Sequence, residues 1–218
     1  SPHIQTSSLI RKHMSEPDYW TEAVNHLRSN DPILSKVIDE NLRPFLSPNG
    51  NVGNTLIKSI VGQQISVKAA DSVWRKMEGL LGTVNPGNIV LCDIQDLRGC
   101  GLSMRKSEYI LDFSKLWVDC LRDLDWFSMD AGDVRNRLLE LRGVGPWTVD
   151  MVMIFALGQP DILPLGDIGL IRAIERTYAG GSNLEIEEIL DISTGWSPYR
   201  TVATWYLWRV VDPDPVNY

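Results

Sequence analysis

The segment that most constrains the fold is Gly143-Val144-Gly145-Pro146, which lies between two apolar helical patterns. Proline suits the first position of a helix, because its missing N–H would have no partner there. Glycine adopts positive φ at low cost and lets a ligand approach the backbone. The pattern therefore predicts a helix ending over 138–142, a tight hairpin with positive φ at its glycines, and a second helix from Pro146. Exposed amides before a helix start can bind phosphate, although an ordinary structural corner explains the glycines equally well.

The rest of the chain shows apolar residues at helical spacing and no sustained period-two alternation. We therefore predict an all-α fold. Residues 1–16 are polar and expected to fray, and the loop at 47–53 is a candidate domain crossing. Helices are expected over 20–27, 32–38, 56–61, 67–81, 104–117, 147–157, 167–178, 184–192 and 198–211, with a short element near 89–91.

Composition indicates a globular chain that buries a core, since 44% of its 218 residues are hydrophobic and 22% are charged. No apolar run approaches the ~20 residues that cross a bilayer, and the N-terminus lacks the order of a signal peptide. We therefore expect an intracellular protein with no membrane partner. Cys92, Cys100 and Cys120 are odd in number and scattered, which disfavours disulfides and zinc or iron–sulfur sites. No cofactor is expected.

The formal charge of −7 argues against strong non-specific binding to nucleic acid. Acidic residues concentrate over 16–40 and 185–191, however, while the interval 52–77 carries four basic residues and only Asp71. Any affinity for DNA should therefore be modest and depend on backbone amides as much as on basic side chains.

Asp167 follows Pro164-Leu165-Gly166 and precedes an apolar helical pattern, so it should lie at a helix N-terminus. A capping role is the commoner explanation of such an aspartate. The two roles are compatible, because a helix N-terminus favours a negative charge. An ionised carboxylate can stabilise a developing cation or orient an attacking water.

Eight tryptophans are many for this length. Most should lie in the core, and the spacing of Trp205 and Trp208 in an apolar stretch favours this for both. A minority around a pocket could stack on a flat ligand and attract a cationic one.

Five segments together resemble the base-excision DNA glycosylases with a helix-hairpin-helix motif, and most closely the 3-methyladenine DNA glycosylase II family. The similar segments are LRGVGPWTVDM and PLGDIGL, which carry the hairpin and aspartate signature, SIVGQQISVKAA at 59–70, GLSMRKSEYI at 101–110 and GWSPYRTVATWYLWR at 195–209. The resemblance covers residues 18–212. It implies two helical subdomains with a cleft between them. Residues 1–51 would pack with 160–218 as one discontinuous subdomain, and residues 52–159 would form the subdomain that carries the helix-hairpin-helix.

The resemblance also implies roles for individual residues. Asp167 matches the catalytic aspartate. Base-pocket positions are matched by Trp147, Trp196 and Met151, and DNA-binding positions by Gly143, Val144, Gly145, Gln63, Gln64, Ile65, Ser103, Arg105 and Lys106. The segment 63–65 falls where the family places a wedge that fills the gap left by a flipped nucleotide, although a bacterial member has a bulky apolar residue where Gln64 stands. The hairpin at 141–146 is a possible site for a monovalent cation.

The implied activity is monofunctional excision of alkylated purines, of the 3-methyladenine and 7-methylguanine type, from double-stranded DNA by a monomeric enzyme. Bifunctional relatives keep a nucleophilic lysine where this chain has Trp147, so a Schiff-base route lacks its amine. The enzyme would be cytoplasmic in a bacterium or nuclear in a eukaryote. Two alternatives stay open at this point: a glycosylase for deaminated or oxidised bases, and a non-catalytic helix-hairpin-helix module that binds DNA.

Overall fold

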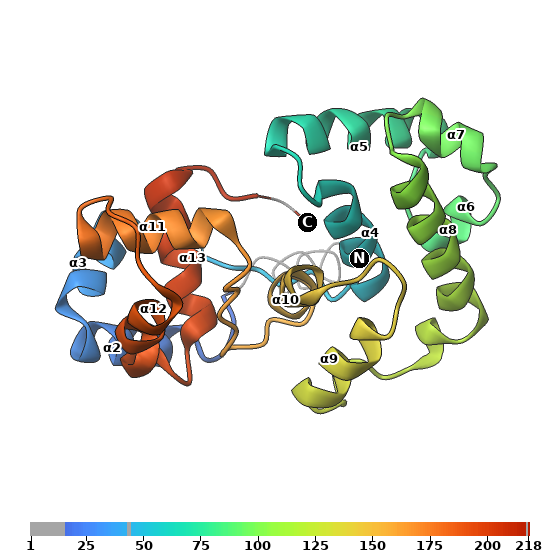
Figure 1. Ribbon diagram of the computed structural model, residues 1–218. Coiled ribbons are helices and arrows are strands. Elements are labelled where there is room, and N and C mark those ends of the chain that lie inside the picture. Colours follow the sequence, from blue (N-terminus) through green and yellow to red (C-terminus); the bar gives the residue numbers. More distant parts are fainter. Residues whose placement is uncertain (1–15, 43–44, 217) are drawn as a thin grey trace, which may run out of the picture. The chain divides into compact units, whose positions relative to one another are not determined.

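The computed structural model describes residues 16–42, 45–216 and 218, and these residues form helices without a β-strand (Figure 1). This result confirms the all-α prediction. Apart from Glu16, the segment expected to fray lies outside the described residues. None of the described helices is long and apolar enough to span a membrane.

The described residues divide into two compact units. Unit 1 comprises those of 1–49 and 158–217, and its helices are α2 (Trp20–Asn30), α3 (Pro32–Glu40), α11 (Ile168–Ala179), α12 (Ile186–Ser193), the 3₁₀ helix η2 (Thr194–Trp196) and α13 (Arg200–Val211). Unit 2 comprises 50–157 and Tyr218, and its helices are α4 (Val52–Gly62), α5 (Val67–Leu81), α6 (Pro86–Ile89), α7 (Ile94–Gly99), α8 (Met104–Asp119), η1 (Leu121–Asp123), α9 (Ala131–Leu139) and α10 (Pro146–Phe155). Helix α7 was not expected, because six residues are too few to show a helical period.

Unit 1 is organised around α13, which packs along α11 and also contacts α2 and α3. Every residue from Thr201 to Leu207 is buried, as expected for a helix enclosed by others. Asp31 joins three elements of this unit. It caps α3 by accepting the Leu34 N–H (2.9 Å), and its Oδ2 accepts the Tyr178 hydroxyl (2.5 Å) and the Trp196 indole N–H (2.8 Å). Burial, together with the bond to Asp31, raises the pKa of Tyr178 above its usual range.

Unit 2 is organised around α4, which packs against α10, α5 and α8, while α6 and α7 pack against α8 (Figure 1). The middle of α4 is apolar on several faces, with Leu56, Ile57 and Ile60 fully buried. Gly53 lets α4 approach Trp117 closely, since a Cβ at this position would lie 2.9 Å from the indole Cε2. Unit 2 therefore fixes α4, α8 and α10 as one packed body.

Candidate active site

Asp167 is the N-cap of α11, as its place in the sequence predicted. Its Oδ2 accepts the Leu170 N–H at 2.9 Å, and its backbone is extended, with φ −89° and ψ 111°. The side chain is half-buried. The cap thus holds a carboxylate at the positive end of a helix dipole without sealing it in the core.

Trp208 is a second residue at this carboxylate, although its helical spacing predicted a place in the core. Its indole Nε1 donates to the same Oδ2 of Asp167 at 2.8 Å, from the last turns of α13. The indole is half-buried, whereas the seven residues before it, 201–207, are all buried. Helical spacing could not show this contact, because it assigns a face of the helix but not the polar atom opposite.

The loop before Asp167 is tied down at nearly every residue. Tyr19 donates its hydroxyl to Gly158 O (2.6 Å). Thr201 donates its N–H to Pro160 O and its hydroxyl to Gln159 O. Asp161 then accepts Arg200 Nε at 2.7 Å. Burial alone would raise the pKa of Asp161, but hydrogen bonds from Arg200 and Ser197 and the charge of Arg200 outweigh it and hold this pKa below its usual range. The loop therefore presents Asp167 from a fixed frame.

The predicted hairpin joins α9 to α10. Gly143 has φ +81°, and a Cβ there would lie 2.2 Å from the Tyr109 ring, so only glycine fits without displacing that ring. Arg142 lies over the same ring, 5.3 Å from its centroid, and pairs with Glu108 (3.1 Å) and Asp112 (3.3 Å) of α8. The hairpin is thus clamped against α8.

Positive φ at the other glycine was a wrong expectation. Gly145 has φ −106° and ψ −178°, which is extended backbone open to any residue, and no atom lies within 4 Å of an added Cβ. The reason is that one left-handed residue, Gly143, already reverses the chain, after which Gly145 only leads into Pro146. Val144 is buried, and its N–H donates to Leu141 O at 3.2 Å. Within the described part of the chain, the N–H groups of Gly143 and Gly145 donate to no protein acceptor.

The segment 63–65 follows α4 directly. Gln63 is half-buried, and its amide Nε2 donates to Gly143 O and to Thr148 Oγ1, both at 2.9 Å. Gln64 is exposed and has φ +58°, the one positive φ at a non-glycine residue in the described chain. Ile65 is 41% exposed. Two solvent-facing side chains therefore project from a turn that the hairpin supports.

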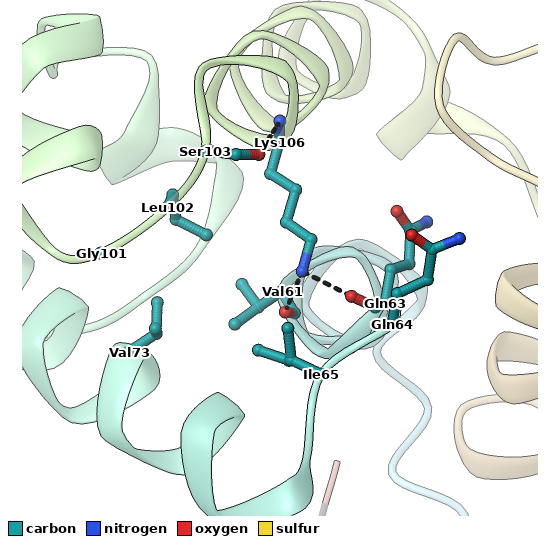
Figure 2. A pocket seen from close by; sticks show the side chains of 9 residues that line it. All are labelled: Val61, Gln63, Gln64, Ile65, Val73, Gly101, Leu102, Ser103 and Lys106. Atoms are coloured by element: carbon teal, nitrogen blue, oxygen red, sulfur yellow. Dashed lines mark hydrogen bonds between the residues drawn. The ribbon is translucent and has the colours of Figure 1, made fainter.

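A recess of about 260 Å³ brings this turn together with the start of α8 (Figure 2). Its lining residues are Val61, Gln63, Gln64, Ile65, Val73, Gly101, Leu102, Ser103 and Lys106. Ser103 caps α8 by accepting the Lys106 N–H (3.1 Å). Five of the sequence-predicted DNA-binding residues thus meet at one place, whereas the exposed Arg105 is not part of the lining.

The three residues assigned to a base pocket differ in accessibility. Trp147 lies on the first turn of α10 and is half-buried, near Gly62 of α4. Met151, one turn later, is 2% exposed. Trp196 belongs to unit 1, has no exposed surface and donates its indole N–H to Asp31. Trp147 is therefore the most accessible of these three side chains.

No group of three or more His, Cys, Asp or Glu side chains in the described residues could hold a metal ion. The hairpin offers carbonyl oxygens instead. Leu141 O accepts the Val144 N–H, and Gly143 O accepts the Gln63 amide. A carbonyl oxygen has two lone pairs, so both oxygens keep capacity for a monovalent cation. That cation stays a prediction.

An all-helical chain with a glycine hairpin between two helices and a capping aspartate after a Pro/Gly loop defines the class of helix-hairpin-helix DNA-repair proteins. Residues 57–197 match the family described as HhH-GPD superfamily base excision DNA repair protein. The chain belongs to this family.

Individual relatives agree with the family match. The YfjP protein of Bacillus subtilis is 33% identical over 204 residues, covering 88% of this chain and 71% of that protein. A solved structure of 3-methyladenine DNA glycosylase from Schizosaccharomyces pombe in complex with abasic DNA has a TM-score of 0.77 at 25% identity, covering 86% of this chain and 95% of that one. A solved DNA-3-methyladenine glycosidase from Bacillus halodurans has a TM-score of 0.73 at 32% identity, covering 87% of this chain and 89% of that one.

Proposed function

We propose that this chain is a monofunctional DNA glycosylase of base-excision repair, which hydrolyses the N-glycosidic bond of alkylated purines. The observation that carries the proposal is Asp167, a half-buried capping carboxylate whose Oδ2 accepts hydrogen bonds from Leu170 and Trp208. The 3-methyladenine specificity in the names of the two solved relatives supports the substrate class.

Alkylation at a ring nitrogen leaves a purine positively charged and weakly bonded to its sugar, so the base departs without much protonation. Asp167 stabilises the oxocarbenium-like sugar and orients or deprotonates the attacking water. One carboxylate then suffices, unlike the acid–base pair of most glycosidases. Trp147 stacks on the flipped base, and its π-face favours a cation. Because Trp147 replaces the nucleophilic lysine of bifunctional relatives, the abasic strand stays intact.

Further residues act on the duplex or support those that do. The amides of Gly143 and Gly145 bind a backbone phosphate, and a monovalent cation at 141–146 accompanies them. Gln64 and Ile65 form the wedge, and Arg105 adds a phosphate contact. Trp196 and Met151, which are enclosed, support the surfaces around them rather than touch the base. The enzyme acts as a monomer inside the cell, in the cytoplasm of a bacterium or the nucleus of a eukaryote.

A panel of duplexes, each with one modified base, tests this function. Each duplex is incubated with the protein and then heated in alkali, which converts abasic sites to strand breaks. Breaks at 3-methyladenine or 7-methylguanine are the expected result. Breaks only at deaminated or oxidised bases would reassign the substrate, and duplex binding without breaks on any substrate would leave a DNA-binding module.

A further inference from the structure

We infer that Gln63 and Lys106 are positioning residues, which hold the exposed turn at Gln64 and Ile65 in its DNA-engaging conformation and couple it to the hairpin. The family resemblance implies a direct role in binding DNA for both residues. The inference rests on the proposed function, because it assigns how that function's wedge is held.

Lys106 directs its ammonium at the end of α4 rather than at solvent. Its Nζ donates to Val61 O at 2.9 Å and to Gln63 O at 2.7 Å, as Figure 2 shows. Val61 lies in the last turn of α4 and Gln63 is its C-cap, a place where carbonyls lack helical partners and carry negative partial charge. Burial lowers the pKa of Lys106. A side chain so engaged is a clamp on α4, and two of its three donors are already used.

Gln63 links the same turn to the hairpin. Its backbone oxygen is held by Lys106, while its side-chain amide donates to Gly143 O and Thr148 Oγ1, both at 2.9 Å. Thr148 is 1% exposed, so this end of the network lies inside unit 2. One residue therefore joins the end of α4, the hairpin and the first turn of α10.

Gln64 shows why the turn needs this support. Its φ of +58° costs a non-glycine residue roughly 1 kcal/mol or more, and such a conformation persists only where neighbouring contacts impose it. The exposed side chain of Gln64 does not supply those contacts by burial. Gln63 is held on one side, and on the other Ser66 caps α5 by accepting the Ala69 N–H (3.1 Å). The clamp thus fixes a strained residue whose side chain faces outward.

The test compares Lys106→Met with Lys115→Met, a matched control that removes the same charge from an exposed site on the same helix. Affinity is measured for a duplex with an abasic-site analogue and for the undamaged duplex, over a range of salt concentrations. A positioning role predicts that Lys106→Met lowers the ratio of the two affinities by about tenfold, as expected for losing a charge-assisted hydrogen bond. Lys115→Met should leave the ratio unchanged, and Lys106→Arg, which can still donate to both carbonyls, should restore it.

Other outcomes overturn the inference. If Lys106 contacts phosphate directly, Lys106→Met weakens both duplexes equally, and the slope of log affinity against log salt falls by about 1 more than in Lys115→Met. If its role is only structural, the melting temperature falls while the ratio stays native. A native protein that does not prefer the abasic analogue overturns the proposed function, and this inference with it.

Gln63→Met supplies an independent arm, and it carries the test if Lys106→Met does not fold. It keeps the length of the side chain but removes both donated hydrogen bonds, and it should also lower the ratio by about tenfold. The double variant should lose little beyond either single variant, because both residues act on one turn. Additive losses would show two separate contacts and contradict the coupling.

Discussion

The hydrogen bond from Trp208 to Asp167 predicts that an uncharged aromatic residue far along the sequence controls the rate of base release. Trp208→Phe keeps an aromatic ring on α13 but removes the indole N–H, which lies 2.8 Å from Oδ2 of Asp167. The Leu170 N–H stays in place at 2.9 Å and maintains the capping geometry. The carboxylate then loses a fixed donor to Oδ2 and can turn about its own bond.

The magnitude follows from the energy of a hydrogen bond to a charged group, which contributes about 1.5–3 kcal/mol. Losing this hydrogen bond also destabilises the ground state, so only part of its energy is added to the activation free energy. We therefore expect an increase near the lower end of that range. A change of about 1.4 kcal/mol in the activation free energy corresponds to tenfold in rate. Trp208→Phe should therefore slow single-turnover excision by about tenfold, while affinity for abasic-site duplex stays within about twofold.

The assay measures single-turnover release of an alkylated purine, with melting temperature recorded for each variant. Trp205→Phe is the matched control, because Trp205 lies on the same helix but packs against Trp20 and beneath Arg209. It should lose stability, since Trp205 is buried, without a comparable loss of rate in the folded fraction. Native excision by folded Trp208→Phe would refute the positioning argument. An equal loss of rate in Trp205→Phe would show that general loosening of unit 1 is the cause.

The remaining predictions concern the reaction and the hairpin. Asp167→Asn should lower base release by at least ~10²-fold while DNA binding persists, by analogy with the loss of one preorganised electrostatic group; release at the native rate would remove Asp167 from the mechanism. The abasic product strand should break only in alkali or heat, because Trp147 supplies no amine, and a covalent adduct trapped by borohydride would contradict this. Gly143→Ala should lower the free energy of unfolding by ~1–3 kcal/mol, because the new Cβ would clash with Tyr109 at a position of positive φ. Gly145→Ala should change that free energy by less than ~0.5 kcal/mol, as a melting experiment on both variants can check. Gly145→Val should remain folded but bind all duplexes more weakly, by about the same factor. Unchanged affinity would show that the hairpin has a structural role only.

Asp167 could be placed from the sequence because a helix start has a local signature. A polar cap, a preceding Pro/Gly loop and an apolar helical pattern all lie within a few residues of each other. Trp208 could not be placed in the same way. Its contact joins residues 41 positions apart, and its spacing from Trp205 is that of any core helix. Local patterns thus locate the carboxylate but not the donor that orients it.

The two glycines of the hairpin show a second limit. Glycine is compatible with positive φ but does not require it, and the sequence gives both residues the same signal. Only Gly143 lies beneath the Tyr109 ring, and Tyr109 comes from α8, which is distant in sequence. The adjacent glutamines differ for a similar reason. Gln63 follows α4 where its amide can reach Gly143 O, whereas Gln64 is turned outward by its left-handed backbone.

Acidic side chains also neutralise positive charge beside the hairpin, and the net charge of the chain does not show this. Arg142 lies next to the hairpin glycines that we propose bind phosphate, but Glu108 and Asp112 both pair with it, so the three side chains together have a formal charge of −1. Lys106 is turned toward the carbonyls of α4. Both of these cations therefore make contacts that stabilise the local structure. We therefore expect any phosphate at this turn to be bound by the backbone N–H groups of Gly143 and Gly145, which add no formal charge and donate to no acceptor in the described structure.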